Sequence, residues 1–482
     1  MRRPRRGAVP PTAAGTLAAM SEPVPSTPDV LEKLVSLCKQ RGFFFGSSEI
    51  YGGINALYDY GPLGARMRRN VRNLWWRAMV ESRDDVEPIE TSIIMNPQVW
   101  VASGHVATFS DPLVDCTGTC RKRWRADHLG DLRRERGKPE DAPGCPECGG
   151  PLTKARQFNL MFRTHLGPVA DDAAQVYLRP ETAQGMFVNF ATVVQAMRRR
   201  LPFGIAQLGK SFRNEISPSN SIFRTREFEQ MEMEFFCKPG TDVEWHDYWC
   251  TERMRWWTED CGVRGSRLRL RVHDKEELSH YSTATSDVEY LFPWGWGELE
   301  GVADRTDFDL RSHMEHSGRD LSYFDTETTE RYVPFVIEPA AGLDRGCLTM
   351  LVDAYDEEEV RGEKRVVLRL HPDVAPWQVA VLPLSKKPQL TEVSRALAVR
   401  LRTRFRTEHD ETQSIGRRYR RQDEIGTALA VTVDFDSLED NAVTIRERDG
   451  MTQVRVPIEQ LERACEDQLA ACRASALQRA RE

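Results

Sequence analysis

The chain has 482 residues, enough for about three domains of ordinary size. Hydrophobic residues make up 40% and charged residues 29%, a composition that can bury a core and excludes a chain that is disordered throughout. The net charge is 67 − 73 = −6, which excludes a histone-like protein that holds nucleic acid by its overall charge. A local basic surface on an acidic body stays possible.

Two further features bear on location. No apolar run approaches the ~20 residues needed to span a bilayer, so we expect a soluble protein without a membrane partner. Seven of the eleven cysteines stand isolated in apolar or helical contexts, which predicts a reducing compartment, the cytoplasm, and no disulfide framework. These seven are Cys38, Cys237, Cys250, Cys261, Cys347, Cys465 and Cys472.

Residues 1–28 are rich in proline and arginine, and we predict a disordered tail. The tail lacks the apolar stretch of a secretory signal, whereas an organelle presequence or an upstream start codon, with Met20 as the natural beginning, both stay open. Beyond it, apolar residues at helical spacing predict helices over 29–41 and 65–81.

The middle and the end of the chain differ in their predicted secondary structure. Residues 176–236 predict short strands around a helix, 240–262 a further helix, and 266–310 antiparallel strands. After Leu370, apolar strands alternate with helices, which predicts an α/β domain with a mostly parallel sheet over 371–482. Its predicted elements are strands at 379–384, 428–436 and 441–449, a helix over 391–404, and a last helix whose first turn holds Pro457.

Four cysteines lie in a polar, basic segment, residues 112–156, which we interpret as an insertion. Cys116 and Cys120 form one close pair, and Cys145 and Cys148 form a second. Two such pairs on tight turns are typical of a four-thiolate zinc site. Unrelated buried thiols fit less well, because a polar segment cannot bury them. The basic stretch between the pairs could contact phosphates or be an ordinary solvated face.

A charged hairpin follows in the sequence. The stretch FRNE closes one strand, and the polar loop before the next strand carries further arginines. The hairpin presents Arg213, Arg224 and Arg226 around its turn, with Glu215 and Phe228 nearby. Arginines can clamp a triphosphate, and a phenylalanine offers a face on which a purine stacks.

A second element of the same kind comes much later. In GLDRG, Gly342 and Gly346 flank Arg345 before a predicted helix, where the backbone can approach a ligand closely. Either pattern alone is weak, because charged hairpins are usually solvated surface. Both together, in this order, indicate a site for a nucleoside triphosphate.

The motifs of the hairpin and of the GLDR segment resemble those of a known protein family. FRNE, FRTREF and GLDR resemble the second and third signature motifs of class II aminoacyl-tRNA synthetases. More narrowly, SSEIYGGINALYDYGPLG, MNPQVWVASGHV, YLRPETAQGMFVNF and WGELEGVADRTDFDL resemble the dimeric bacterial type of glycyl-tRNA synthetase, and so does RRYRRQDEIGTALAVTVDFDSLEDNAVTIRERD. The resemblance covers about residues 29–460 in collinear order.

The resemblance implies a fold and an activity. We expect an α+β class II catalytic domain with an antiparallel sheet over 29–370, the zinc-binding insertion within it, and a C-terminal α/β anticodon-binding domain. The implied enzyme is a homodimer that attaches glycine to tRNA(Gly) through a glycyl-adenylate, using ATP and Mg²⁺.

By similarity, Arg213 would hold the α-phosphate and the glycine carboxylate in line, and Arg213 and Arg345 would be catalytic. Glu215 would recognise the adenine amino group, Phe228 would stack on adenine, and Arg224 and Arg345 would hold the outer phosphates. Glu298 would bind ATP, in part through Mg²⁺. The full implied ATP site is Arg213, Asn214, Glu215, Phe223, Arg224, Thr225, Arg226, Glu227, Phe228, Glu298, Leu299, Gly342, Leu343, Asp344 and Arg345.

For glycine the resemblance implies an acidic pocket. Glycine offers only an ammonium and a carboxylate, so its selection needs carboxylates, a cation and a wall where a Cβ would lie. The matching positions are Arg125, Glu181, Phe228, Glu229, Gln230, Met231, Glu232, Glu338, Pro339, Ala340, Ala341 and Gly342. At Ala340 the pattern EPSxG would have serine, so one hydrogen bond to substrate is missing, and a specialised paralogue stays an alternative.

The C-terminal domain carries a basic cluster, in which Arg417, Arg418, Arg420 and Arg421 surround Tyr419. Such a cluster suits single-stranded RNA, although a structural role is equally open. Two other classes of function compete with the synthetase. One is a nonenzymatic, synthetase-like accessory protein that binds nucleic acid, and the other is a ligase that charges a carrier protein.

Overall fold

The computed structural model describes residues 28–168, 174–216, 220–275, 278 and 282–482, so the predicted N-terminal tail lies outside the described residues apart from Pro28. The chain begins with helix α1 (Pro28–Arg41) and the short antiparallel strands β1 (Phe44–Gly46) and β2 (Tyr58–Tyr60). Helix α2 (Pro62–Trp76) continues as a π-helical turn, Arg77–Glu81. Both predicted helices are therefore confirmed.

A seven-stranded sheet organises residues 29–370, the region in which the resemblance implies a catalytic domain (the catalytic region). Its order is β11 (Leu268–Val272), β12 (Ala284–Phe292), β13 (Gly295–Thr306), β16 (Phe335–Gly342), β10 (Glu227–Cys237), β9 (Phe203–Phe212) and β3 (Val86–Pro88). Every neighbouring pair is antiparallel except β3 and β9. The antiparallel sheet is thus confirmed. Strands β9 and β10 have 10 and 11 residues, longer than the short strands predicted for 176–236.

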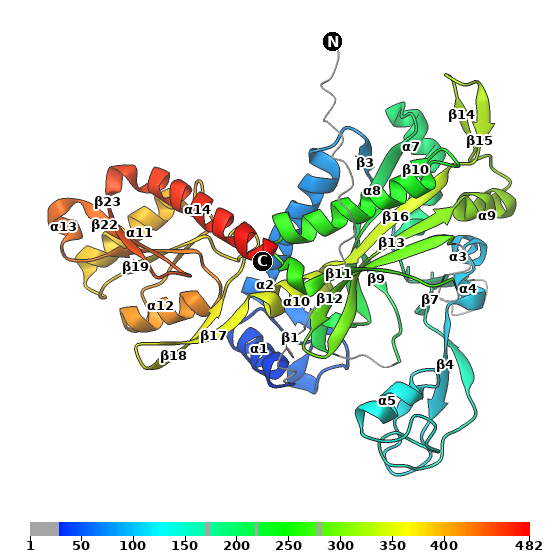
Figure 1. Ribbon diagram of the computed structural model, residues 1–482, viewed down its shortest axis with the longest axis horizontal. Coiled ribbons are helices and arrows are strands. Elements are labelled where there is room, and N and C mark those ends of the chain that lie inside the picture. Colours follow the sequence, from blue (N-terminus) through cyan, green and yellow to red (C-terminus); the bar gives the residue numbers. More distant parts are fainter. Residues whose placement is uncertain (1–27, 169–173, 217–219, 276–277, 279–281) are drawn as a thin grey trace, which may run out of the picture.

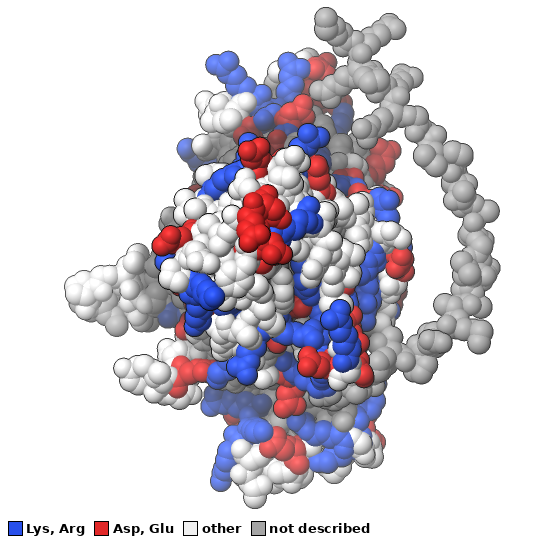
Figure 2. All heavy atoms as spheres, turned by 90° about the vertical axis from the view of Figure 1, so that its left-hand side faces the viewer, with Lys and Arg blue, Asp and Glu red and all other residues white. Residues whose placement is uncertain are grey.

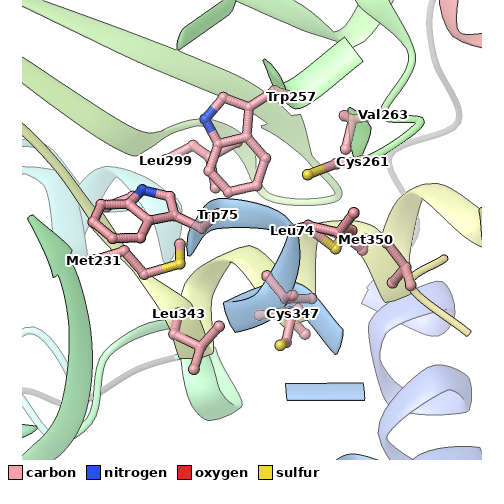
Figure 3. Close-up of a cluster of buried hydrophobic side chains, with 14 of the residues drawn as sticks. Leu74, Trp75, Met231, Trp257, Cys261, Val263, Leu299, Leu343, Cys347 and Met350 are labelled. Atoms are coloured by element: carbon pink, nitrogen blue, oxygen red, sulfur yellow. The ribbon is translucent and has the colours of Figure 1, made fainter. Parts of the chain in front are cut away.

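One face of this sheet is covered by helices α2, α8 (Asp242–Arg255) and α10 (Leu343–Ala354), which bury the main hydrophobic core (Figure 1). Figure 3 shows Trp75 and Trp257 in this core beside side chains of the strands and of α10. Because successive residues of a strand point to opposite faces, every second side chain of the central strands is left for the other face, where the cavity lies.

The insertion is a small unit that projects from the catalytic region (Figure 1). Its three-stranded antiparallel sheet has the order β5 (Arg123–Arg125), β4 (Ser110–Asp115), β6 (Arg156–Asn159), and α5 (Leu129–Glu135) packs beside it. The strands at its base therefore reach from 110 to 159, slightly beyond the predicted 112–156.

Shorter elements complete the catalytic region. They are α3 (Pro97–Ala102), α4 (His105–Thr108), β7 (Arg163–His165), β8 (Gln175–Tyr177), α6 (Ala183–Phe187), α7 (Phe190–Met197), α9 (Phe308–Ser317), β14 (Tyr323–Asp325), β15 (Glu330–Tyr332), β17 (Tyr355–Val360) and β18 (Glu363–Leu368). Three-residue 3₁₀ turns lie at Glu49–Tyr51, Ser221–Phe223, Gly265–Arg267 and Ile458–Gln460.

The C-terminal sheet has the order β20 (Thr407–His409), β19 (Val379–Pro383), β21 (Leu429–Val433), β22 (Ala442–Glu447), β23 (Gln453–Pro457). Strand β19 runs parallel to β20 and β21, whereas β21–β22 and β22–β23 are antiparallel. The prediction of a mostly parallel sheet was therefore wrong. The segments that join the last three strands are too short for a parallel crossover, which needs a dozen or more residues.

Helices α11 (Pro388–Leu401), α12 (Ile415–Glu424), α13 (Ser437–Asp440) and α14 (Leu461–Arg481) accompany this sheet. Pro457 ends β23 instead of starting the last helix, so that detail of the prediction was wrong. The main core extends to Ala375, and the core of the C-terminal sheet begins at Val379. No helix in the described ranges is long and apolar enough to cross a membrane.

Candidate active site

A cavity of about 390 Å³ opens on the face of the catalytic sheet away from the helices. Residues of the β9–β10 hairpin, β12, β13, β16 and the start of α10 line it. The predicted site residues that it brings together are Glu181, Arg213, Glu215, Phe223, Arg224, Thr225, Phe228, Gln230, Glu232, Glu298, Glu338, Ala340, Ala341, Gly342, Asp344 and Arg345.

Other predicted residues do not line the cavity. Met231, Leu299 and Leu343 point into the hydrophobic core (Figure 3). Glu229 is buried on the same side and pairs with Arg68 at 2.9 Å. The cause is strand alternation, since Phe228, Gln230 and Glu232 of β10 take the cavity face and the residues between them cannot. Pro339 alternates in the same way with Glu338 and Ala340 on β16.

The remaining predicted residues that do not line the cavity form hydrogen bonds or ion pairs elsewhere. Arg226 donates to the carbonyl oxygens of Glu215 and Asn55, Glu227 pairs with Lys210 at 2.6 Å, and the Asn214 N–H donates to the Leu160 carbonyl. In the insertion, Arg125 pairs with Asp111 at 2.9 Å and Asp127 at 2.6 Å. The structure places these four side chains outside the cavity lining.

One end of the cavity is basic and aromatic. The Arg213 guanidinium carbon lies 5.4 Å from the ring centroid of Phe228 and 5.5 Å from that of Phe109, and its Nε donates to the Pro180 carbonyl. Arg345 follows the N-terminus of α10 and lies 4.4 Å from the Phe223 ring centroid. With Arg224, which also lines the cavity, these groups form a cationic surface beside half-buried phenylalanine rings, suited to a nucleoside triphosphate.

A carboxylate stands within this basic end. Glu298 lies 3.2 Å from Arg345 Nη1. Attraction to Arg345, and then to Arg213 and Arg224, lowers the pKa of Glu298. Asp287 lines the same cavity and pairs with His273 at 2.7 Å. Carboxylate oxygens next to a phosphate site fit the preference of Mg²⁺ for hard oxygen ligands.

The other end of the cavity is acidic and includes Glu181, Glu232 and Glu338. Burial would raise the pKa of Glu181, but His105, Arg305 and Gln184 outweigh it and hold that pKa well below its usual range. For Glu232, burial and then repulsion by Glu338 and Glu181 raise the pKa to about 8. Carboxylates that face each other in this way can accept the hydrogens of an ammonium group.

Sequence reasoning missed several residues of this end. Arg305 is buried, donates to both carboxylate oxygens of Glu338 at 3.0 and 3.1 Å, and pairs with Asp309 at 2.8 Å. Behind them, neither carboxylate oxygen of Glu234 has a hydrogen-bond partner. The available signal was a run of charges, DRTDFD, which begins at the end of strand β13. The further lining residues not predicted are Ile222, His273, Thr285, Asp287, Gly301 and Ala303.

The four cysteines of the insertion come together as predicted. Sγ of Cys116 lies 3.4 Å from Sγ of Cys148, Sγ of Cys120 lies 3.5 Å from Sγ of Cys145, and all four sulfur atoms lie within 4.8 Å of one another. A tetrahedron with 2.3 Å Zn–S bonds has edges of about 3.8 Å, so this group has the size for one Zn²⁺. None of the eleven cysteines, which all lie in the described part of the chain, forms a disulfide.

The basic cluster of the C-terminal domain is a helix, α12, and it divides into two kinds of residue. Arg418 is buried and donates to the carbonyl oxygens of Glu411, Thr412 and Gln413, so its role is structural. Arg417 stays exposed. Figure 2 shows basic and acidic side chains interspersed over this side of the molecule, without a large patch of one sign.

Comparisons with known families agree with this architecture. Residues 162–421 match the family model described as tRNA synthetase class II core domain (G, H, P, S and T), and residues 378–468 match the anticodon binding domain. In fold the chain is similar to prolyl-tRNA synthetase from Cryptosporidium parvum, solved with L-proline and AMP, at a TM-score of 0.65 and 14% identity over 94% of this chain and 80% of that one. The fold is that of a class II aminoacyl-tRNA synthetase.

Comparison with curated relatives shows which family within this class the chain belongs to. The chain is 54% identical to the glycine–tRNA ligase of Caldanaerobacter subterraneus subsp. tengcongensis over 91% of this chain and 98% of the relative. It is 54% identical to that of Thermobifida fusca and 55% identical to that of Streptomyces coelicolor, each over 92% of this chain and 99% of the relative. The chain belongs to the glycine–tRNA ligase family.

Proposed function

We propose that this protein attaches glycine to the 3′ end of tRNA(Gly) in an ATP-dependent reaction that passes through a glycyl-adenylate. The observation that carries the proposal is a single cavity with two unlike ends. At one end Arg213, Arg224 and Arg345 surround Glu298, and at the other Glu181, Glu232 and Glu338 face one another beside Arg305. The first end complements a triphosphate and the second complements an ammonium group. The two reactants of adenylate formation therefore fit side by side in one site.

Adenylate formation needs no protein base, because the glycine carboxylate is itself the nucleophile that attacks the α-phosphate. Catalysis then consists of alignment and stabilisation of negative charge. Arg213, at the basic end, would hold the α-phosphate and the glycine carboxylate. Arg224 and Arg345 would hold the outer phosphates, Phe228 would stack on adenine, and Glu215 would accept from its amino group.

Glycine would bind with its ammonium toward Glu181, Glu232 and Glu338. Gly301 and Ala340, which pair across β13 and β16, contribute only hydrogen or methyl to the cavity surface between them. A larger amino acid would have to fit its Cβ into the same enclosed space. Exclusion by shape discriminates against larger substrates more strongly than a pocket that must reject smaller ones.

Two metal ions belong to the proposal. Mg²⁺ bound with ATP would be held by Glu298 and would neutralise phosphate charge. Zn²⁺ bound by the four cysteines would be structural, because all four positions of a tetrahedron are filled by thiolates. The insertion then keeps its fold and its contact with the cavity. Asp111 and Arg125 of the insertion lie close enough to Glu215 for its charge to raise the pKa of both side chains.

We further propose a homodimer of the bacterial type that works in the cytoplasm. Ile50 and Tyr51 of one loop are 88% and 87% exposed, which is unusual for side chains of this kind, and a partner subunit would cover them. Free thiols throughout the chain fit a reducing compartment. Sedimentation at micromolar concentration tests the dimer.

The two competing classes receive less support. A nonenzymatic accessory protein has no need for an intact ATP site, yet Arg213, Glu215, Phe228 and Arg345 all line the cavity. A ligase for a carrier protein has no need for an anticodon-binding domain, which this chain has.

The decisive experiment is ATP–pyrophosphate exchange with glycine, alanine or serine. We expect exchange with glycine only, followed by charging of tRNA(Gly). Arg213→Ala should lose on the order of 3 kcal/mol of transition-state stabilisation, as removal of a positioned donor does. Lys210→Ala, outside the cavity lining, is the control. Exchange that is absent, or that does not depend on the amino acid, in a folded protein would refute the proposal.

A further inference from the structure

Behind the acidic end of the cavity lies a buried amide whose hydrogen-bonding groups are all used. Gln184 is fully buried on α6. Its Nε2 donates to Oε1 of Glu181 at 2.9 Å and to Oδ1 of Asp309 at 2.9 Å. Its Oε1 lies 2.8 Å from Nε2 of His313 on α9. The amide thus joins two carboxylates on one side to an imidazole on the other.

This arrangement fixes the orientation of the amide. A carbonyl oxygen can only accept, so Nε2 of His313 must carry the hydrogen. Burial lowers the pKa of His313, so the ring is neutral with that nitrogen as its donor. If the donor were lost, the amide could rotate and turn its oxygen toward the two carboxylates, which would repel it. His313 therefore decides which end of Gln184 faces Glu181.

The same chain of contacts reaches a second carboxylate of the pocket. Asp309 accepts from Nε and Nη2 of Arg305 at 2.8 and 2.9 Å. Arg305 in turn donates from Nη1 to both oxygens of Glu338. Neither His313 nor Gln184 is among the residues that line the 390 Å³ cavity; His313 instead lines a separate cavity of about 700 Å³ beside α3, α7 and α9.

We infer that His313 is a positioning residue for the amino-acid substrate: through Gln184 it orients Glu181, and through Asp309 and Arg305 it orients Glu338, so that both carboxylates meet the ammonium group. The inference rests on the proposed function. It predicts an effect on glycine binding from a side chain that touches neither glycine nor ATP, and no effect on the ATP end of the cavity.

A matched pair of variants tests the inference by glycine-dependent exchange. His313→Leu keeps similar bulk but removes the donor, and His313→Gln keeps an N–H group at nearly the same place. We expect His313→Leu to raise the glycine KM about 10-fold, the effect of leaving one buried acceptor unpaired, with the ATP KM within about twofold of wild type. His313→Gln should recover most of the loss.

Gln184→Met, which keeps the length of the side chain and removes the amide, provides the same test if His313→Leu does not fold. It should also raise the glycine KM while leaving the ATP KM unchanged. An unchanged glycine KM in a folded variant, or an equal rise for glycine and ATP in both histidine variants, would overturn the inference. Wild-type protein without glycine-dependent exchange would instead refute the proposed function, so the two failures are distinguishable.

Discussion

At the scale of single residues, Ala340 is the position where this chain departs from the EPSxG pattern of the family it resembles. It lies in the middle of the catalytic sheet, opposite Glu232 on β10 and Gly301 on β13, and its methyl group lines the cavity. A serine here would place a hydroxyl beside the acidic end. We therefore propose that this position contacts the substrate in the glycine site.

We expect Ala340→Ser to lower the glycine KM about 2–13-fold, which corresponds to ~0.5–1.5 kcal/mol for one neutral hydrogen bond. The kcat should change little, because a contact made equally in the ground and transition states affects mainly binding. Steady-state exchange kinetics on both proteins measure the difference. If the glycine KM does not move, the hydroxyl makes no contact with substrate in this chain.

We expect Glu232 to make the proposed glycine binding dependent on pH. With its pKa raised to about 8, Glu232 is mostly protonated in the free enzyme at pH 7, because burial and then repulsion by Glu338 and Glu181 outweigh the hydrogen bond from Thr182, which favours the carboxylate. An ammonium group favours the ionised form, so binding must release the proton. Because release becomes easier as pH rises toward 8, the glycine KM should fall about fivefold between pH 7 and pH 8.

Exchange assays at the two pH values check this, with the ATP KM as the internal control. Calorimetry in buffers of different ionisation enthalpy should show close to one proton released per glycine bound at pH 7. Glu232→Gln should bind glycine more weakly and without this pH dependence. A glycine KM that is the same at both pH values would contradict the assignment.

At the scale of elements, the join between the catalytic region and the C-terminal domain depends on buried charges. Asp423 on α12 accepts from Arg365 on β18 and from Arg446 on β22, each at 2.9 Å. All three side chains are buried. One carboxylate thus holds together a hairpin of the catalytic region and two elements of the C-terminal domain.

Asp423→Ala should destabilise the protein by on the order of 3–5 kcal/mol, because it leaves two buried guanidinium groups without their shared counter-ion. Urea denaturation followed by circular dichroism measures the change. Asp467→Asn is the matched control: its carboxylate is exposed and 3.9 Å from Arg463, so its effect should stay within about 0.5 kcal/mol. An equal loss of unfolding free energy in the two variants would show that the buried carboxylate of Asp423 contributes no more to stability than an exposed one.

At the scale of the whole molecule, the insertion is the part least able to hold its own fold. Its buried core consists of Val114, Cys116, Trp124 and Cys145, and two of these four are proposed zinc ligands. A core this small cannot offset the conformational entropy of the segment without a cross-link. We therefore expect the insertion to fold only when metal is bound. The seven-stranded sheet is stabilised by its own hydrophobic core and should stay folded without the metal.

We expect one Zn²⁺ per chain by elemental analysis, and a chelator should make the insertion sensitive to trypsin at the basic residues between Arg121 and Lys138. The rest of the chain should stay resistant. Cys145→Ser should reproduce the effect, whereas Cys472→Ser, an isolated thiol in α14, should not. Well under one equivalent of zinc, with no change on chelation, would exclude the site.

The sequence by itself predicted what is local. The two cysteine pairs, the hairpin that carries Arg213 and Arg224, and the helix that begins after Gly342 each depend on a few consecutive residues. Turn residues, helix caps and short spacings between residues depend on neighbours in the sequence, so these features can be predicted without knowledge of the fold. Likewise, period-3.6 patterns predicted α1 and α2 because an amphipathic helix shows its buried face in its own sequence.

Only the tertiary structure decided which side chains share the cavity. Glu181, Arg305 and Glu338 come from segments far apart in the chain, and the register of β10 against β9 and β16 puts Glu232 in the cavity and Glu229 on the opposite face. The directions of the C-terminal strands were misjudged for a related reason. Strand pairing and burial depend on contacts between distant segments, and the period of two along a strand does not say which of its faces will be buried.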